Sequence, residues 1–476
     1  MNTKALRQKI LDLAIHGKLV PQDPNDEPAS VLLERIRDEK ERLIKEGKIK
    51  RPKKTKTTSD KPHYPYELPK GWVWCKLSDC CHIAGRIGFR GYTKDDLVEF
   101  QKGAITLSPS NIIDGEMDYN KCTYISWDKY EESPEIEVLE GDILLVKTGS
   151  SFGKCALVDK LPWKSTINPQ FVILKYISIN EQYLTWVLQS SYARNNYNDF
   201  VLGTAIPTFT QVVLGNMPIP LPPISEQLKI VNKLKHLFLS INSLENNKKS
   251  LCTLIKESKS KVLDLAIHGK LVPQDPTDEP ASELLKRINP KAEITCDNGH
   301  YQKLPEGWCE TQLGDIFNHN TGKALNSSNT EGTLKDYLTT SNVYWNSFDF
   351  SVIKKMLFKE SELNKCQITK GDLLVCEGGD IGRAAIWDYD YDICIQNHLH
   401  RLRPKVNGIC VPFYYYVLYY LKINNMIGGK GIGLLGLSSN ALHKLHVPFP
   451  PLNEQHRIVA KIEEIFAQLD AIEASL

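Results

Sequence analysis

The stretch LDLAIHGKLVPQDPNDEPAS, from Leu11 to Ser30, recurs as LDLAIHGKLVPQDPTDEPAS from Leu263 to Ser282. Nineteen of the twenty positions are identical, and only Asn25 and Thr277 differ. The two copies lie 252 residues apart in a chain of 476, which indicates an internal duplication. We therefore expect each half of the chain to build the same kind of unit.

Three shorter motifs recur in the same order, with offsets that fall from 236 to 228 residues. Between these motifs the two halves differ at most positions. The repeated parts are expected to do one job twice, and the divergent parts to bind two ligands or two halves of one asymmetric ligand. The motif pairs are Leu68–Trp72 (LPKGW) and Leu304–Trp308 (LPEGW), Gly141–Leu144 (GDIL) and Gly371–Leu374 (GDLL), and Pro222–Gln227 (PPISEQ) and Pro450–Gln455 (PPLNEQ).

A long helix is predicted after each proline motif, because apolar residues follow at alternating spacings of three and four. Such a seam buries best against another helix, as in a coiled coil. The polar run 245–249 interrupts the first seam, and the sequence leaves open whether the helix bends, kinks or continues there. The seams are Val231, Leu234, Phe238 and Ile241, and Val459, Ile462, Phe466 and Leu469.

The equivalences also relate the two chain ends. Met1 corresponds to Thr253 and Leu476 corresponds to Lys248, so both ends together make a second copy of the central helical region. We expect two long antiparallel helical regions in a pseudo-two-fold, circularly closed arrangement with adjacent termini.

Mixed α/β is the predicted fold class, since each module combines short apolar strands with a late helix, at 183–196 and 413–425. Residues 31–46 are predicted to form a mixed-charge helix with a solvated face. The expected domains are an N-terminal helical segment and basic linker (1–63), a first globular module (64–223), a central helical spacer with linker (224–300), a second module (301–451) and a C-terminal helix that pairs with the central one (452–476).

Composition is that of a globular protein, with 41% hydrophobic and 24% charged residues. The net charge of +2 neither favours nor excludes a polyanionic partner, so nucleic-acid binding would depend on local patches. The first residues show no secretory signal and the twelve cysteines form no CxxC pair, which favours a reducing cytoplasm. The basic run KIKRPKKTK at 48–56 is either a solvated tether or a phosphate contact.

With these motifs in this order, each seen twice, the chain resembles the specificity (S) subunit of a type I restriction–modification system, a bacterial defence. The resemblance implies that each module is a target recognition domain that reads one half of an asymmetric, bipartite site in double-stranded DNA. It implies that the helices set the gap between the halves and dock two modification (M) subunits.

The resemblance also implies that the chain is not catalytic and holds no cofactor or metal. S-adenosylmethionine and the methyltransferase chemistry belong to the M subunits, and two restriction (R) subunits can add ATP- and Mg-dependent cleavage. The complex would be cytoplasmic, and nucleoid-associated when bound to DNA.

Several near-matches to other motifs are expected to carry no chemistry. Residues 149–155 imitate a phosphate loop, but they have one residue too few and a cysteine in place of Ser or Thr. Residues 431–436 match G-x-G-x-x-G but follow a helical pattern rather than a strand. Residues 168–171 (NPQF) lack a proline of the adenine-methyltransferase loop. Cys394, His398 and His400 could seed a metal site, although strand alternation explains the two histidines as neighbours on one face.

Two sets of residues are the predicted contacts. Lys and Arg favour guanine, Asn and Gln favour adenine, and acids accept from cytosine, although any of these residues could instead close a turn. The predicted DNA contacts are Arg86, Arg90, Ser110, Asn111, Lys147, Thr148, Ser150, Lys154 and Gln170 in the first module, and Ser341, Asn342, Glu377, Asp380, Arg383, Asn397 and His400 in the second. The predicted M-subunit contacts are His16, Lys18, Leu19, Gln22, Glu226, Gln227, His268, Lys270, Leu271, Gln274, Glu454 and Gln455.

Two other functions remain open on the sequence alone. One is a protein–protein scaffold that does not read DNA, which the near-zero net charge favours. The other is a self-sufficient adenine methyltransferase, which would need a cofactor site in this chain. Salt-dependent DNA binding and cofactor binding by the chain alone distinguish these from the first hypothesis.

Overall fold

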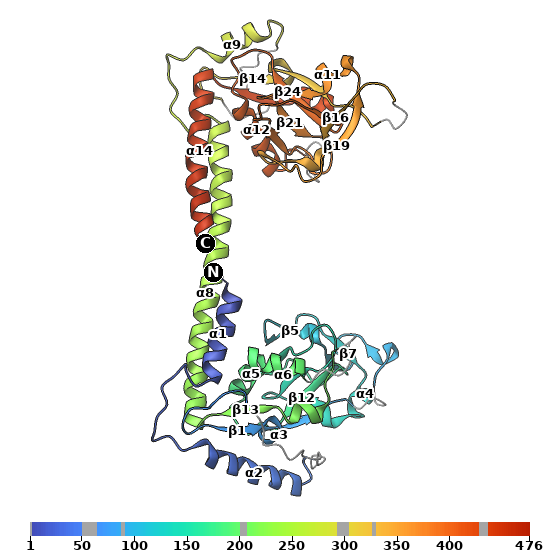
Figure 1. The fold of residues 1–476 in the computed structure, drawn as a ribbon, viewed down its shortest axis with the longest axis vertical. Coiled ribbons are helices and arrows are strands. Elements are labelled where there is room, and N and C mark those ends of the chain that lie inside the picture. The colour runs from blue at the N-terminus through green and yellow to red at the C-terminus, as the bar shows by residue number, and fades with distance from the viewer. Residues whose placement is uncertain are drawn as a thin grey trace. The chain divides into compact units, whose positions relative to one another are not determined.

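The computed structural model describes residues 2–49, 64–86, 91–199, 207–292, 304–325, 330–427 and 437–476. The chain forms two compact units, Met1–Asn246 and Asn247–Leu476. Each unit combines one sheet-containing module with a pair of packed helices (Figure 1). The predicted mixed α/β class, with two sheet-containing domains and long helices that pack together, is confirmed.

Unit 1 is built on two sheets and a short two-stranded ribbon. All neighbours in the first sheet are antiparallel, while β4 and β11 in the second are parallel. In order across each sheet, the strands are β10 (Cys155–Leu157), β9 (Ile143–Val146), β12 (Phe171–Lys175) and β2 (His82–Ala84), and then β3 (Leu97–Val98), β7 (Thr123–Ile125), β4 (Ala104–Leu107), β11 (Ser165–Ile167) and β8 (Glu137–Val138); the ribbon pairs β1 (Val73–Lys76) with β13 (Pro218–Leu221).

Unit 2 repeats this plan, one strand shorter in its second sheet. A small hairpin accompanies the sheets in both units, β5 and β6 in the first and β17 and β18 in the second. The strands are β15 (Phe317–Thr321), β24 (Leu399–Pro404), β21 (Leu373–Cys376) and β22 (Ala384–Ile386), then β19 (Lys354–Phe358), β16 (Thr333–Leu338), β23 (Ile393–Ile395) and β20 (Gln367–Ile368), with β14 (Cys309–Gln312) on β25 (His446–Phe449); the hairpins are Ile112–Ile113 with Glu116–Met117 and Val343–Tyr344 with Ser347–Phe348.

The apolar run after each Gly-Asp pair forms a strand that is buried on both faces. In β9, Ile143 and Leu145 point into the core shared with the helices, whereas Leu144 and Val146 point into the core between the two sheets. The run 373–376 in β21 divides its side chains between two cores in the same way. A strand covered on both sides needs a continuous apolar run, which is why the motif shows no alternation.

Three helices form the packed pairs. Helix α8 (Ile224–Ile267) includes the polar stretch 245–249, so the helical backbone continues there. Its first part packs against α1 (Thr3–Ile15) in unit 1, and its later part packs against α14 (Leu452–Ser475) in unit 2 (Figure 1). The predicted seam residues Val231 and Leu234 lie buried against α1. The circular closure of the two units stays a prediction.

Two helix predictions need correction. The late helix of the first module is two helices, α5 (Glu181–Gln189) and α6 (Ser191–Asp199), because the Ser190 hydroxyl donates to the carbonyl of Val187 and accepts from the N–H of Ala193. Its counterpart α12 (Val411–Ile423) is continuous. The mixed-charge helix α2 (Ala29–Lys45) is not merely solvated, because its apolar side chains, Ile36 among them, are buried in the unit 1 core. Helix α9 (Ala281–Ile288) is its shorter counterpart.

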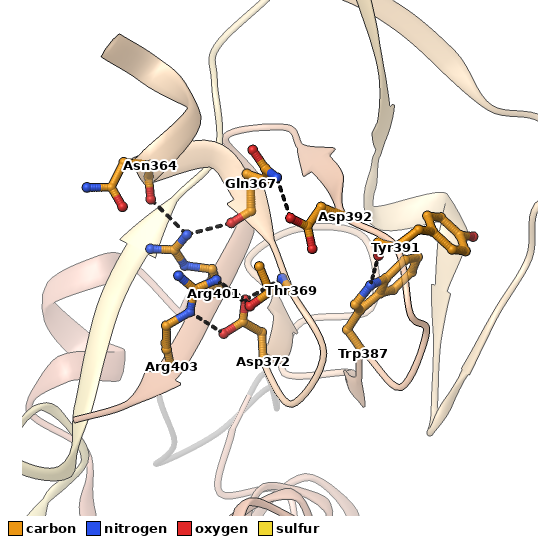
Figure 2. A network of polar contacts seen from close by, with 9 residues as sticks. All are labelled: Asn364, Gln367, Thr369, Asp372, Trp387, Tyr391, Asp392, Arg401 and Arg403. Atoms are coloured by element: carbon orange, nitrogen blue, oxygen red, sulfur yellow. Dashed lines mark hydrogen bonds and ion pairs between the residues drawn. The ribbon is translucent and has the colours of Figure 1, made fainter. Parts of the chain in front are cut away.

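The Gly-Asp motif forms the same buried ion pair in both units. Asp142 accepts from the backbone N–H of Leu139 and from Lys175, 2.8 and 2.6 Å away. Asp372 accepts from Thr369 and from two nitrogens of Arg403 (Figure 2). Burial raises the pKa of Asp142 despite its bonds to Lys175, so the carboxylate is held where water is largely excluded. The aspartate thereby fixes the turn that leads into the buried strand.

The remaining motifs meet at a buried glutamate. In unit 1, Glu226 accepts from the indole nitrogen of Trp72 at 2.8 Å and from the side-chain amide of Gln22 at 2.9 Å. In unit 2, Glu454 accepts from Trp308 at 2.9 Å and from Gln274 at 3.0 Å. Both glutamates are 1% exposed. We call this arrangement the motif lock, since each copy joins the LPxGW, PPxxEQ and HGKLVPQ motifs.

A glycine closes the lock at the end of each repeated helix. Gly17 has φ of 65° and Gly269 has φ of 63°, and a Cβ on either would lie 2.3 Å from a proline ring, of Pro69 or Pro305. Only glycine fits both the backbone conformation and the close approach. The carbonyl of each glycine then accepts from the lock glutamine at 2.7 Å.

The next residue of the proline motif ties the helix to its module. Gln227 accepts from the N–H of Asn180 at 2.9 Å, and Gln455 accepts from the N–H of Cys410 at 3.2 Å. Asn180 and Cys410 begin α5 and α12, so the same contact holds the equivalent helix in each unit. The repeated motifs are therefore explained by contacts inside one unit.

We predict that Trp308→Phe destabilises the protein more at pH 8 than at pH 5. Burial raises the pKa of Glu454, whereas the bond from Trp308 lowers it. A raised carboxyl pKa means that stability falls as pH rises from the ordinary value through the raised one. Removing the indole donor raises the pKa further, so the loss should be about 2 kcal/mol at pH 8, where the carboxylate is charged, and about 1 kcal/mol near pH 5.

Thermal unfolding at both pH values measures this difference. Trp345→Phe is the matched control, because Trp345 packs on Tyr415 and Tyr419 in the same unit. An equal loss at both pH values would show that the indole nitrogen does not stabilise a charged carboxylate.

Candidate nucleic-acid and partner interfaces

Three loops of unit 1 gather at one edge of its sheets. They are residues 108–111 after β4, 147–154 between β9 and β10, and 168–170 between β11 and β12. The N–H of Lys147 donates to the carbonyl of Gln170 at 2.8 Å, and the N–H of Asn168 donates to the carbonyl of Leu107 at 2.9 Å. We call these loops the loop cluster of unit 1.

Unit 2 has an equivalent loop cluster, made of residues 339–342, 377–383 and 396–398. The N–H of Glu377 donates to the carbonyl of His398 at 3.0 Å, and Gln396 donates to Leu338 at 2.9 Å. Arg383 joins two of the loops, because its guanidinium donates to the carbonyl of Thr340 at 2.6 Å. The structure thus brings together in each unit most of the residues predicted to contact DNA.

Equivalent backbone bonds in the two clusters carry different side chains. Lys147 and Glu377 occupy the same place, as the bonds to Gln170 and His398 show. Lys154 and Arg383 also correspond, since their carbonyls accept from Val146 and Cys376, both at 2.8 Å. One frame therefore presents a lysine in one unit where it presents an acid in the other.

Several predicted contacts are accessible in these loops. Ser110, Ser150 and Lys154 are exposed in unit 1, as are Ser341 and Asp380 in unit 2. Thr148, Gln170 and Asn397 are partly exposed and also hold the loops in place. Thr148 forms a β-bridge with Thr208, and Gln170 accepts from the side chain of Asn168. The N–H of Asn397 donates to the carbonyl of Lys323.

The charged side chains in the clusters differ in their surroundings. Lys147 is half-buried, and burial lowers its pKa. Asp380 pairs with Lys422 at 2.7 Å. Arg383 lies over the ring of Tyr344 at 4.7 Å, and its Nε is buried without a hydrogen-bond partner. Sequence reasoning missed Tyr344, because only the fold brings it beside Arg383.

Four predicted DNA contacts lie inside the protein. Asn111 and Asn342 each donate to two backbone carbonyls of the following turn, at 2.9 to 3.0 Å. Arg86 donates to Thr166 and to the carbonyl of Ile167. His400 lies between His319 and the carbonyl of Leu437, and burial lowers its pKa. These placements favour structural roles, and Arg90 lies outside the described residues.

The predicted partner contacts divide in the same way. Glu226, Gln227, Glu454 and Gln455 are at most 1% exposed and belong to the motif lock or its neighbouring helix contact. Gln22 and Gln274 bond to the lock glutamates. The Nδ1 atoms of His16 and His268 each donate to a backbone carbonyl one turn earlier, of Asp12 and Asp264. The accessible members are Lys18 and Lys270, with Leu19 and Leu271 partly covered.

The near-matches to other motifs gain no support. Within the described residues, no group of three or more His, Cys, Asp or Glu could hold a metal ion. His398 precedes β24 and is largely exposed while His400 is buried in it, so the predicted same-face arrangement of the two histidines is wrong. Residues 431–436 lie outside the described part. None of the described helices is both long and apolar enough to cross a membrane.

Comparison with known proteins identifies the two modules. A family described as the type I restriction modification DNA specificity domain matches residues 69–252 and 305–476. The chain belongs to this family. Both matched regions run from an LPxGW motif into a proline-gated helix, so the family pattern covers each module and the helix that follows it, α8 up to residue 252 and α14.

Curated specificity subunits are similar in sequence to this chain over almost its full length. The EcoAI specificity subunit of Escherichia coli is 28% identical, covering 97% of this chain and 88% of the relative. The EcoEI specificity subunit of the same species is 26% identical, covering 99% and 90%. This chain is therefore the DNA specificity subunit of a type I system, its non-catalytic component, and S-adenosylmethionine and ATP belong to the other subunits.

Solved structures agree with the fold. The HsdS subunit of Thermoanaerobacter tengcongensis is 19% identical with a TM-score of 0.54, covering 86% of this chain and 93% of that one. A chain from a study of assembly and conformational transition of the type I R-M system is 21% identical with a TM-score of 0.57, covering 86% and 94%. Membership in the family decides against a scaffold without DNA specificity and against a self-sufficient methyltransferase.

We predict that Asn342→Ala lowers the free energy of unfolding of the specificity subunit by about 2 kcal/mol, because two backbone carbonyls lose their donor and the buried N–H of Thr339 loses its acceptor. Ser341→Ala, at the exposed neighbouring position, should change it by less than about 0.5 kcal/mol. Chemical denaturation of both variants measures the difference. Similar stability of the two variants would contradict a structural role for Asn342.

Proposed function

We propose that each loop cluster enters a major groove of double-stranded DNA and reads one half of an asymmetric, bipartite site. The observation that carries the proposal is that equivalent frames present different chemistry at the same places. Direct reading needs donors and acceptors on elements that reach base edges, and the accessible loop residues supply them. Such a complex would work on the nucleoid, within the cytoplasm.

The side chains suggest what each half-site contains. Lys147 and Lys154 give the first cluster two cationic donors, which suit guanine edges or phosphates. Glu377 gives the second cluster an acceptor that suits the amino group of cytosine, beside the donor Arg383. Lys147 is half-buried, and the described contacts include no carboxylate paired with its ammonium group. A hydrogen-bond acceptor on DNA would supply a partner for this group.

Adenine methylation would be done by two modification subunits docked on the helices. A methyltransferase must flip its target base into a pocket, and the specificity subunit would borrow that pocket from its partner. The accessible part of the repeated phrase, around Lys18 and Lys270, is presented once per unit and so fits two copies of one partner. The exposed leucines of α8, such as Leu239 and Leu254, would extend this docking surface, and the helices would set the gap between the half-sites. Two restriction subunits can complete the assembly.

A genome-wide map of adenine methylation tests the reading proposal. A host with the specificity and modification genes should show one new two-part motif that is absent with the modification gene alone. Glu377→Lys should then change or relax one half of that motif and leave the other half and the gap unchanged, since each well-made contact discriminates by about 1–3 kcal/mol. Asp336→Lys, at an exposed side chain of β16 in the same unit, is the control for added charge.

Two outcomes of this map contradict the proposal. A change in both halves of the motif by Glu377→Lys would show that the loop clusters do not read separately. No new motif, with the modification subunit known to be active, would show that the clusters do not direct methylation.

We predict that the double variant Lys18→Glu, Lys270→Glu weakens association with the modification subunit by at least about tenfold, since it reverses one charge on each copy of the docking surface. Lys160→Glu, an exposed change in unit 1 outside the repeat, should have no effect. Titration of purified subunits by calorimetry measures both. Unchanged affinity of the double variant would show that the modification subunit does not dock on the repeated sequence around Lys18 and Lys270.

A further inference from the structure

Unit 2 carries an exposed group of aromatic rings that the DNA-reading proposal does not use. Phe350, Val352, Tyr389 and Tyr391 are between 36 and 65% exposed, and Asp388 and Asp390 stand between the rings along the chain. We call these six residues the aromatic–acidic patch. We propose that it is a docking surface for a lysine- or arginine-rich segment of a partner protein.

The rings are held in place before any partner arrives. Tyr389 lies 4.6 Å from the ring of Trp387, 5.4 Å from Phe350 and 5.7 Å from Tyr391. Trp387 is fully buried and its indole donates to the carbonyl of Tyr391 at 2.8 Å, which closes the loop (Figure 2). Exposed aromatic side chains that are already ordered lose little freedom on binding, and such residues are typical anchors of protein interfaces.

The charges of the patch select a cationic occupant. The side chains of Asp388 and Asp390 are 81 and 90% exposed, and they share one cation, Lys370, at 3.5 and 2.8 Å. Asp392, which accepts from Gln367, adds a third carboxylate at the base of the loop (Figure 2). Carboxylates beside open aromatic faces attract an ammonium or guanidinium group through both charge and cation–π attraction, while the rings cover its apolar stem.

The position of the patch separates it from the proposed DNA surface. Residues 387–391 connect β22 to β23, whereas the loop cluster connects β21 to β22 and β23 to β24. The patch loop and the loop cluster therefore lie at opposite ends of β22 and β23. Its carboxylates would also repel phosphates, so a protein segment is the occupant that the charges favour over nucleic acid. The inference thus goes beyond the DNA-reading proposal and does not depend on it.

Unit 1 lacks the patch at the equivalent place. Val158 corresponds to Trp387, since Gly141 and Gly371 donate to their carbonyls at 2.8 Å. The rest of this loop, up to β11, supplies one acid, Asp159, two lysines and one exposed ring, Trp163, whose indole donates to the carbonyl of Gly103. It therefore has neither the group of rings nor the excess of carboxylates. A partner bound here would occur once per specificity subunit, in contrast to the modification subunits.

Binding of a defined basic peptide to the full chain tests the inference. The probe is a fluorescent peptide KIKRPKKTK, matching residues 48–56, with QIQQPQQTQ as the neutral control. We expect fluorescence anisotropy to show salt-dependent binding of the basic peptide only. Tyr389→Ser with Tyr391→Ser, and separately Asp388→Asn with Asp390→Asn, should each weaken it at least about fivefold, because ring and charge contributions are lost separately.

Asp159→Asn is the matched control and should bind the basic peptide as the parent chain does. Three results would overturn the inference: no binding of the basic peptide at millimolar concentration, equal binding of the neutral peptide, or unchanged binding in both patch variants. Thermal unfolding checks that the exposed substitutions leave the fold intact. Equal weakening of duplex DNA binding in the patch variants would assign the surface to DNA instead and also overturn it.

Discussion

Each half of this specificity subunit depends on a carboxylate kept out of water. A buried charge is costly unless it is hydrogen-bonded, and the lock glutamate is satisfied only when three segments far apart in the sequence meet around it. Glu226 accepts hydrogen bonds from Trp72 and Gln22, and Glu454 accepts them from Trp308 and Gln274. The start of the long helix, the entry to the module and the end of the repeated helix are fixed relative to one another by this one group.

The lock also explains why the repeated and divergent parts separate so cleanly. Three arrangements make the same contacts in both units: the motif lock, the Gly-Asp turn and the turn held by Asn111 or Asn342. The segments that form them therefore keep the same residue types. The side chains of loop residues such as Lys147 and Glu377 take no part in those contacts, and the frame uses only their backbone, so they can differ between the units. A reading surface can therefore change while its support stays constant.

The repeat made much of the fold predictable from the sequence. It gave the order of the pieces, the starts of α8 and α14 next to their proline motifs, and the helix seams, because apolar periodicity reports helix packing directly. The continuity of α8 was not predictable, since a polar run on an exposed helix does not break it. The break at Ser190 escaped notice because it depends on a hydroxyl that bonds to its own backbone.

Site residues were harder to predict than elements. The loops were found, but sequence reasoning took polar residues to be exposed, so Asn111, Asn342 and His400 were expected on the surface and Glu226 and Glu454 at a partner interface. Each is buried by partners from distant segments, which no local pattern reveals. The pairing of Arg383 with Tyr344 was missed for the same reason.

The long sequence separation inside the lock has a consequence for biosynthesis. Trp72 precedes Glu226 by 154 residues, and Gln22 precedes it by 204. During translation the donors therefore emerge long before their acceptor, and the module waits without the helix that fastens it. Unit 1 is completed only when its last helix, α8, begins to form, so a chain that ends before residue 226 leaves the buried indole of Trp72 without its acceptor.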